Sequence, residues 1–184
     1  MQNIMEKGRS MVEMLGVLAI IGVLSIGGLN VFNRMQSSRK STQLMTDFFE
    51  FVTKAKKMSC QFDDGYTDAT VFLYKNNAYP KNWEFDGVNK FIGILNTTYD
   101  VFYNKDSSSG VMTKFRVVIT GLSDSDCMNL VTSDAASRKS SFGFVSMKVK
   151  NRTVYEALNL DNASKACDKG SNGNSVEMTF KGCM

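Results

Sequence analysis

The first third of the chain contains two different hydrophobic patterns. Residues 14–32 include no charged side chain, and a helix of about 20 apolar residues is long enough to cross a bilayer. Beyond this run, apolar residues recur at spacings of four and three, as in an amphipathic helix; they are Leu44, Phe48, Phe51, Ala55 and Met58. No proline interrupts residues 9–59. We therefore expect one long helix over residues 9–59, with residues 9–32 in a membrane or against other helices and the later residues against a globular head.

Residues 60–184 contain shorter segments and are numerous enough for a single core. The patterns predict strands at residues 69–74, 101–103, 112–120, 142–149, 153–158 and 176–180. They predict helices at residues 88–95, from Ser123 onward and from Asp161 to near Cys167. Ser123 with Asp126 three residues later resembles a capping box. This order predicts an α+β fold, in which a long N-terminal helix packs on an antiparallel sheet with short helices.

We expect residues 76–83 to form a loop; this segment contains the chain's only proline and only tryptophan. Tyr79, Pro80 and Trp83 are compatible with an exposed recognition loop, but aromatic residues near a proline more often pack against their own domain. We expect the packed arrangement.

The composition excludes several function classes. The net charge is +4, with acidic and basic residues interspersed, so no basic stripe indicates nucleic-acid binding. The chain has no histidine and no recognisable phosphate loop or thiol nucleophile. We expect no catalytic residues, no cofactor and no metal site, and hence no enzyme.

Four widely spaced cysteines suggest the compartment in which the head resides. Cys60, Cys127, Cys167 and Cys183 lack the close spacings of zinc or redox sites and are typical of two disulfides in an oxidising compartment. The positive charges on the two sides of the apolar run do not settle its orientation, and their count alone would favour the reverse insertion. The cysteines therefore place the head outside the cytoplasm, although spacing alone permits three pairings of four cysteines.

One carboxylate, Glu13, lies at the edge of the apolar run. A charged residue near the centre of a membrane helix costs about 2.5 to 3.5 kcal/mol, and less near its end, so Glu13 needs a partner. Cleavage after Gly8 would leave a new amino terminus at Arg9 and make Glu13 the fifth residue, about one helical turn away. Residues 1–8 would then be a short leader that the mature chain lacks.

The combination of Gly8, Glu13 and the apolar run resembles the cleavage and methylation segment of type IV pilins and type II secretion pseudopilins. The resemblance implies that a prepilin peptidase cuts after Gly8 and methylates the amine of Arg9. It also implies that Glu13 pairs with the amine of a neighbouring subunit when the helices stack. In that family the residue after the cut is usually bulky and apolar, so the Arg9 guanidinium departs from the pattern and competes for Glu13.

The head resembles that of type IVb pilins in a looser way. The matching segments are residues 121–123, residues 127–132, Ala166 with Cys167, and a glycine-rich loop before the final strand. In that family a disulfide joins a short helix to a position shortly before the terminal strand, which implies Cys127 with Cys167. The remaining pair would be Cys60 with Cys183, and the rival is Cys167 with Cys183.

Together the two resemblances imply a major pilin of a type IVb-like pilus. Its partners would be copies of itself, the prepilin peptidase and the inner-membrane assembly machinery. It would reside in the inner membrane before assembly and then in an extracellular filament for adhesion, aggregation or motility. The three expected parts are a leader (residues 1–8), the long helix (9–59) and the head (60–184).

Two alternatives remain open from the sequence. The chain could be a pseudopilin of a type II secretion system or a minor pilin, for which Arg9 is a mild argument. A calcium site would favour the pseudopilin, but Asp161 and Asp168 alone do not make one. The other alternative is a soluble secreted disulfide-bonded domain, cut after Gly27 behind an ordinary signal sequence.

Overall fold

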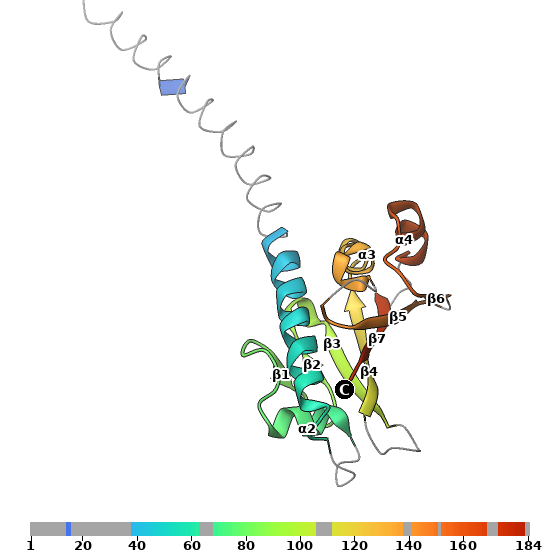
Figure 1. The fold of residues 1–184 in the computed structure, drawn as a ribbon. Coiled ribbons are helices and arrows are strands. Elements are labelled where there is room, and N and C mark those ends of the chain that lie inside the picture. The colour runs from blue at the N-terminus through green and yellow to red at the C-terminus, as the bar shows by residue number, and fades with distance from the viewer. Residues whose placement is uncertain are drawn as a thin grey trace, which may run out of the picture. The chain divides into compact units, whose positions relative to one another are not determined.

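The computed structural model describes residues 14–15, 38–62, 68–105, 112–137, 141–150, 152–168 and 173–182. The chain divides into two units, Met1–Ser41 and Thr42–Met184. In the first unit, Met14, Leu15 and residues 38–41 are helical. In the second unit, residues 42–58 are helical and precede the elements of the head (Figure 1).

The head elements follow in a fixed order along the chain. The helices are α2 (Ala69–Lys75), α3 (Asp124–Thr132) and α4 (Leu160–Ala166), with short 3-10 helices η1 (Ile94–Asn96) and η2 (Asp134–Ala136). The strands are β1 (Glu84–Phe85), β2 (Phe91–Ile92), β3 (Thr98–Lys105), β4 (Met112–Leu122), β5 (Phe144–Val149), β6 (Arg152–Val154) and β7 (Asn174–Lys181).

Within the described residues, seven strands form one sheet in the order β1-β2-β3-β4-β7-β5-β6, and every neighbouring pair is antiparallel. The last strand, β7, lies between β4 and β5 and so joins the two halves of the sheet. Side chains along each strand alternate between two faces. In β4 and β7 the buried hydrophobic positions are Phe115, Val117, Ile119, Leu122, Val176, Met178 and Phe180.

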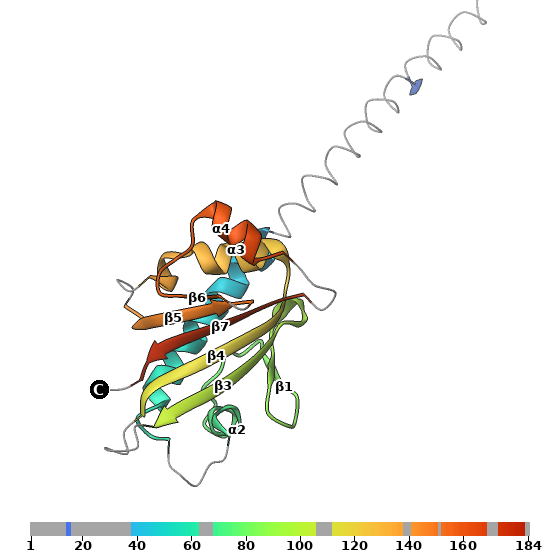
Figure 2. The same cartoon turned by 90° about the vertical axis from the view of Figure 1, so that its right-hand side faces the viewer.

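The N-terminal helix covers this buried face, and Figure 2 shows residues 42–58 behind the sheet. The helix contributes five fully buried side chains on one of its faces; they are Leu44, Phe48, Phe51, Val52 and Ala55. Met58 is half-buried against the same core. The predicted amphipathic stripe is therefore confirmed, and these helix residues belong to the core of the head.

The loop that contains the only tryptophan packs inward. Trp83 is 4% exposed, its ring stacks on Tyr99 with centroids 3.8 Å apart, and it lies 4.8 Å from Phe51. Pro80 is buried and Tyr79 is half-buried. The loop is part of the core, as expected, rather than an exposed recognition loop.

Two predictions of secondary structure are wrong. Residues 69–74, predicted as a strand, belong to helix α2. The Asp68 side chain caps this helix, because it accepts hydrogen bonds from the backbone N–H groups of Thr70 (2.7 Å) and Val71 (3.3 Å). Residues 88–95, predicted as a helix, instead form three features. These are part of the turn between β1 and β2, the strand β2 itself, and the start of η1. Leu95 has a φ of 60°, a left-handed conformation that an α-helix excludes.

The other predicted elements are present with small shifts. Ser123 caps α3 by accepting a hydrogen bond from the Asp126 N–H at 3.1 Å. Helix α4 is capped two residues earlier than expected, by Asn159 rather than Asp161. Strand β6 ends at Val154, so the predicted strand over 153–158 is shorter and begins one residue sooner.

Candidate assembly segment and disulfide-bonded region

The predicted assembly residues Gly8, Arg9 and Glu13 lie outside the described residues, so their roles stay predictions. Next to them, Met14 and Leu15 are helical, and these residues are 69% and 61% exposed. Among the described segments, no helix combines the length and the apolar character that a membrane crossing requires. The apolar run over residues 16–32 lies outside these segments.

Hydrogen bonds connect the helix of residues 42–58 to the rest of the head. The Lys54 ammonium donates to the carbonyl oxygen of Tyr79 at 2.9 Å and pairs with Glu50 at 2.7 Å. The Tyr103 hydroxyl donates to the carbonyl oxygen of Ala55 at 2.8 Å. The Ala55 carbonyl also accepts a hydrogen bond from the Ser59 N–H at 2.9 Å, so Tyr103 on β3 adds a second donor near the end of the helix.

Burial changes the ionisation of two tyrosines in the core. Burial raises the pKa of the Tyr103 phenol far above its ordinary value. Burial also raises the pKa of Tyr99 to about 12, and the hydrogen bond that its oxygen accepts from Thr97 opposes that rise. Both phenols therefore stay protonated in the folded head at pH values where an unfolded chain begins to lose these protons.

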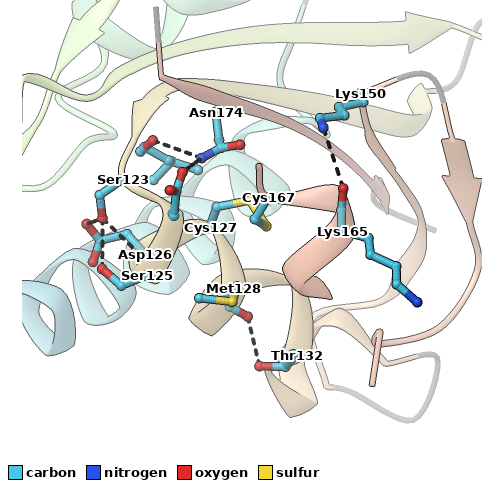
Figure 3. The surroundings of a disulfide bond; sticks show 12 residues. Ser123, Ser125, Asp126, Cys127, Met128, Thr132, Lys150, Lys165, Cys167 and Asn174 are labelled. Atoms are coloured by element: carbon cyan, nitrogen blue, oxygen red, sulfur yellow. Dashed lines mark hydrogen bonds between the residues drawn. A yellow bond between two sulfur atoms is a disulfide. The ribbon is translucent and has the colours of Figure 1, made fainter. Parts of the chain in front are cut away.

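The second polar region surrounds a disulfide bond at one end of the sheet. Cys127 on α3 and Cys167 at the end of α4 are bonded, with their Cα atoms 5.7 Å apart (Figure 3). Both cysteines are buried. This is the pair that the resemblance to type IVb pilins implied, and the bond closes a segment with a sequence separation of 40 residues.

Cys60 is also disulfide-bonded. Its predicted partner, Cys183, lies outside the described residues, so the Cys60 to Cys183 pairing remains a prediction.

Hydrogen bonds join the disulfide-bonded segment to the central strands. The Asn174 side-chain amide, at the start of β7, donates to the Asp124 carboxylate at 2.8 Å (Figure 3). The Leu158 N–H, between β6 and α4, donates to the carbonyl oxygen of Val131 at 2.9 Å. The disulfide therefore acts together with contacts from β7 and from the β6–α4 connection to hold α3 and α4.

A recess of about 380 Å³ lies beside this region, on the face of the sheet opposite the N-terminal helix. Its lining is mostly polar: Val118, Lys148, Lys150, Asp168, Gly173, Asn174, Ser175 and Glu177. The Lys150 ammonium lies 3.8 Å from Asp168, and both side chains are largely exposed, so this contact contributes little stability. In the described part of the chain, no three His, Cys, Asp or Glu side chains are grouped to hold a metal ion.

The sequence of residues 60–181 matches the family model of Bundlin. The match spans 122 of the 184 residues and covers the disulfide-bonded region and all strands of the sheet. The chain belongs to the Bundlin family. It is therefore a type IV pilin with a type IVb-like head, a subunit of a type IV pilus, and the Bundlin family is one of structural proteins rather than enzymes.

The fold of the head is also found in a solved structure. The Bundlin-family head is similar to the crystal structure of a type IVb pilin from Salmonella typhi, with a TM-score of 0.55, 16% identity, and coverage of 73% of this chain and 95% of that chain. The NMR structure of the type IVb pilin PilS from Salmonella typhi matches with a TM-score of 0.48, 17% identity, and coverage of 77% and 96%. No curated protein matches the sequence. The predicted α+β pilin fold is confirmed.

Sequence patterns did not identify the polar contacts that fasten the helix to the head. The Tyr103 hydroxyl reaches Ala55 from 48 residues away, and Lys54 reaches Tyr79 from 25 residues away. Neither pair forms a motif, because each depends on how β3 and the 76–83 loop pack against the helix.

Proposed function

We propose that this chain is the major structural subunit of a type IVb-like pilus. A prepilin peptidase cleaves it after Gly8 and methylates the amine of Arg9. The subunit then leaves the inner membrane, and its N-terminal helices pack into a filament in which Glu13 pairs with the amine of a neighbouring subunit. The filament serves adhesion, aggregation or motility at the cell surface.

The observation that carries this proposal is the order of parts in one chain. A segment with Gly8, Glu13 and an uncharged run precedes a head that matches the Bundlin family from residue 60 onward. A carboxylate at the edge of an apolar helix is costly unless it is paired. A positively charged amine from the next subunit relieves this cost only when the helices stack in the correct register, so the pairing favours ordered assembly.

The mature N-terminus and the role of Glu13 are tested together in the native host. We expect mass spectrometry of the mature chain to find a start at Arg9, with a methyl group on its amine. We expect Glu13→Ala to reduce the filaments sheared from cells by at least about tenfold, because an unsatisfied charged partner costs more than about 1.4 kcal/mol. Immunoblots of whole cells measure subunit levels.

Glu6→Ala is the matched control, because it removes a carboxylate from the leader that cleavage discards. It should leave filament yield unchanged. A mature chain that starts at Gly28 would lack Glu13 and contradict the proposal, as would normal assembly of the Glu13→Ala chain. The unusual Arg9 is compatible with one alternative role, that of a minor pilin. A small ratio of this chain to other pilins in sheared filaments would favour the minor pilin.

A further inference from the structure

The face of the sheet opposite the N-terminal helix carries an unbalanced group of cations. Lys114 on β4 and Lys181 on β7 are direct cross-strand partners, and both are exposed. Like charges directly opposite each other on one face destabilise a sheet. Neither lysine forms a salt bridge within the segments that the structure describes, so the fold itself does not explain why both are cationic.

Arg116 lies on the same face, two residues after Lys114. Its guanidinium carbon lies 4.6 Å from the ring centroid of Phe102, and that phenylalanine is 39% exposed. The guanidinium makes a long 3.5 Å contact with Glu177. Its Nε is buried and has no hydrogen-bond partner among the described residues. We call Phe102, Lys114, Arg116 and Lys181 the Arg116 surface.

A recess of about 270 Å³ adjoins the Arg116 surface. Its lining is largely aromatic and apolar, with three polar side chains: Phe62, Asp68, Ala69, Val101, Phe102, Tyr103, Asn104 and Arg116. Three cations lie on the Arg116 surface, whereas two carboxylates adjoin it, Glu177 beside Arg116 and Asp68 in the recess. The exposed ring of Phe102 lies among these cations. Its natural partner is a small protruding element with carboxylates beside an apolar side chain.

The hairpin of β1 and β2 has this chemistry. Glu84 and Asp86 are exposed carboxylates, Val88 at the turn is 71% exposed, and the hairpin has a single cation, Lys90. One Asp86 oxygen stabilises the turn by accepting hydrogen bonds from three successive backbone N–H groups, at 2.8, 2.9 and 2.9 Å. These bonds also keep the pKa of Asp86 below its usual value, so its charge persists in mildly acidic media.

The hairpin cannot fill the Arg116 surface of its own chain. In Figure 2, the β1–β2 turn and the end of β3 lie on opposite sides of α2. The Arg116 surface is built on the paired ends of β3, β4 and β7. Two different patches on one molecule that fit each other make a heterologous contact, which repeats from subunit to subunit instead of closing into a pair.

We propose that the β1–β2 hairpin of one copy of this chain docks on the Arg116 surface of a second copy. Glu84 and Asp86 approach the three cations, and Val88 covers the exposed ring of Phe102. This inference rests on the proposed function, because it specifies a contact between heads that the stacked helices bring together.

A charge exchange between the two patches tests the proposal in the native host. Glu84→Lys and Lys114→Glu are made singly and together in the full chain. Neither side chain has a hydrogen-bond or ion-pair partner among the described residues, so both changes should be compatible with folding. Glu156→Lys and Arg152→Glu are matched controls, because they make the same changes of charge at exposed positions in β6 and just after it.

Each single exchange is expected to reduce sheared filaments by at least about fivefold at unchanged subunit level, because facing like charges oppose docking. The double exchange should restore at least half of the parent yield, and the controls should assemble normally. Single exchanges that assemble like the parent would overturn the inference, as would a double exchange no better than the worse single. If the parent chain forms no filaments, the proposed function fails instead.

Discussion

Gly93 provides a sharp test of the packing around the only tryptophan. Its φ of −96° and ψ of −169° are open to any residue, so replacement by alanine adds no backbone strain. The new Cβ would lie 2.7 Å from the Tyr99 ring carbon Cε2, and 3.2 Å from both the Trp83 Nε1 and the Thr97 Oγ1. All three neighbours belong to buried side chains.

The ring of Tyr99 has little room to move away. It is fully buried, it stacks on Trp83 at 3.8 Å, and it contacts Phe48 and Phe51 with centroids 6.4 and 6.3 Å away. Overpacking of a core costs about 1 to 3 kcal/mol, and the lower entropy of the unfolded alanine chain returns about 0.4 to 1 kcal/mol. Gly93→Ala should therefore lower the free energy of unfolding by about 1 to 2 kcal/mol.

Urea unfolding of the full chain in detergent, followed by Trp83 fluorescence, measures this change. Gly87→Ala is the control, because Gly87 has a φ of +82° and no atom within 4 Å of a new Cβ. It tests backbone strain without a clash, and it should leave the folded-state emission of Trp83 unchanged, whereas Gly93→Ala should shift it. Parent-like stability and parent-like emission for Gly93→Ala would refute the description of a tightly packed aromatic core.

Three further predictions follow from the described contacts. Replacing both Cys127 and Cys167 by alanine should lower the free energy of unfolding by about 4 kcal/mol, since the bond closes a segment with a sequence separation of 40 residues; a loss below about 1 kcal/mol in urea would contradict this. Tyr103→Phe should cost about 1 kcal/mol through the lost hydrogen bond to Ala55, and an unchanged urea midpoint would argue against that bond. Because the pKa of Tyr103 is raised in the folded head, the unfolded chain loses this proton first as the pH rises above 10, and the free energy of unfolding falls with pH. In Tyr103→Phe this fall should be shallower by about 1.4 kcal/mol per pH unit. Equal slopes for the two chains in unfolding experiments at alkaline pH would exclude this effect.

Local signals in the sequence were sufficient for the N-terminal helix and for α3. The helix stripe was predictable because its apolar positions from Leu44 to Ala55 are buried against one continuous surface, which imposes a helical period. Ser123 and Asp126 form a short-range cap that needs no tertiary context. The pairing of Cys127 with Cys167 came from the resemblance to type IVb pilins, since spacing alone permitted three pairings.

Helix α2 was missed because Thr70, Val71 and Phe72 favour strands when they are judged one residue at a time. The contrary signal was Asp68, whose carboxylate caps the helix, together with buried positions that follow a helical spacing. Strands β1 and β2 have two residues each, which is too short for any period to appear. Apolar residues around them therefore imitated a helix.

Sheet order and the Arg116 surface were beyond local patterns altogether. The position of β7 between β4 and β5 depends on pairings between residues far apart in sequence. Lys114 and Lys181 become neighbours only through that pairing, and Arg116 faces Phe102 only through the register of β3 with β4. A single sequence contains these residues but not the register that gathers them.

The boundary between the two units at Ser41 has a simple physical basis. From Leu44 to Ala55 the helix gives five fully buried side chains to the head core, and burying a side chain such as Leu or Phe contributes about 1.5 to 3 kcal/mol. Such a sum is comparable to the whole stability of a typical domain, about 5 to 15 kcal/mol, so the head requires this part of the helix. The contacts of Tyr103 and Lys54 then fix the end of the same helix to β3 and to the 76–83 loop. The helix thus contributes to the fold from residue 42 onward, while the face of the sheet that it leaves uncovered presents the polar and charged side chains of β3, β4 and β7 to other molecules.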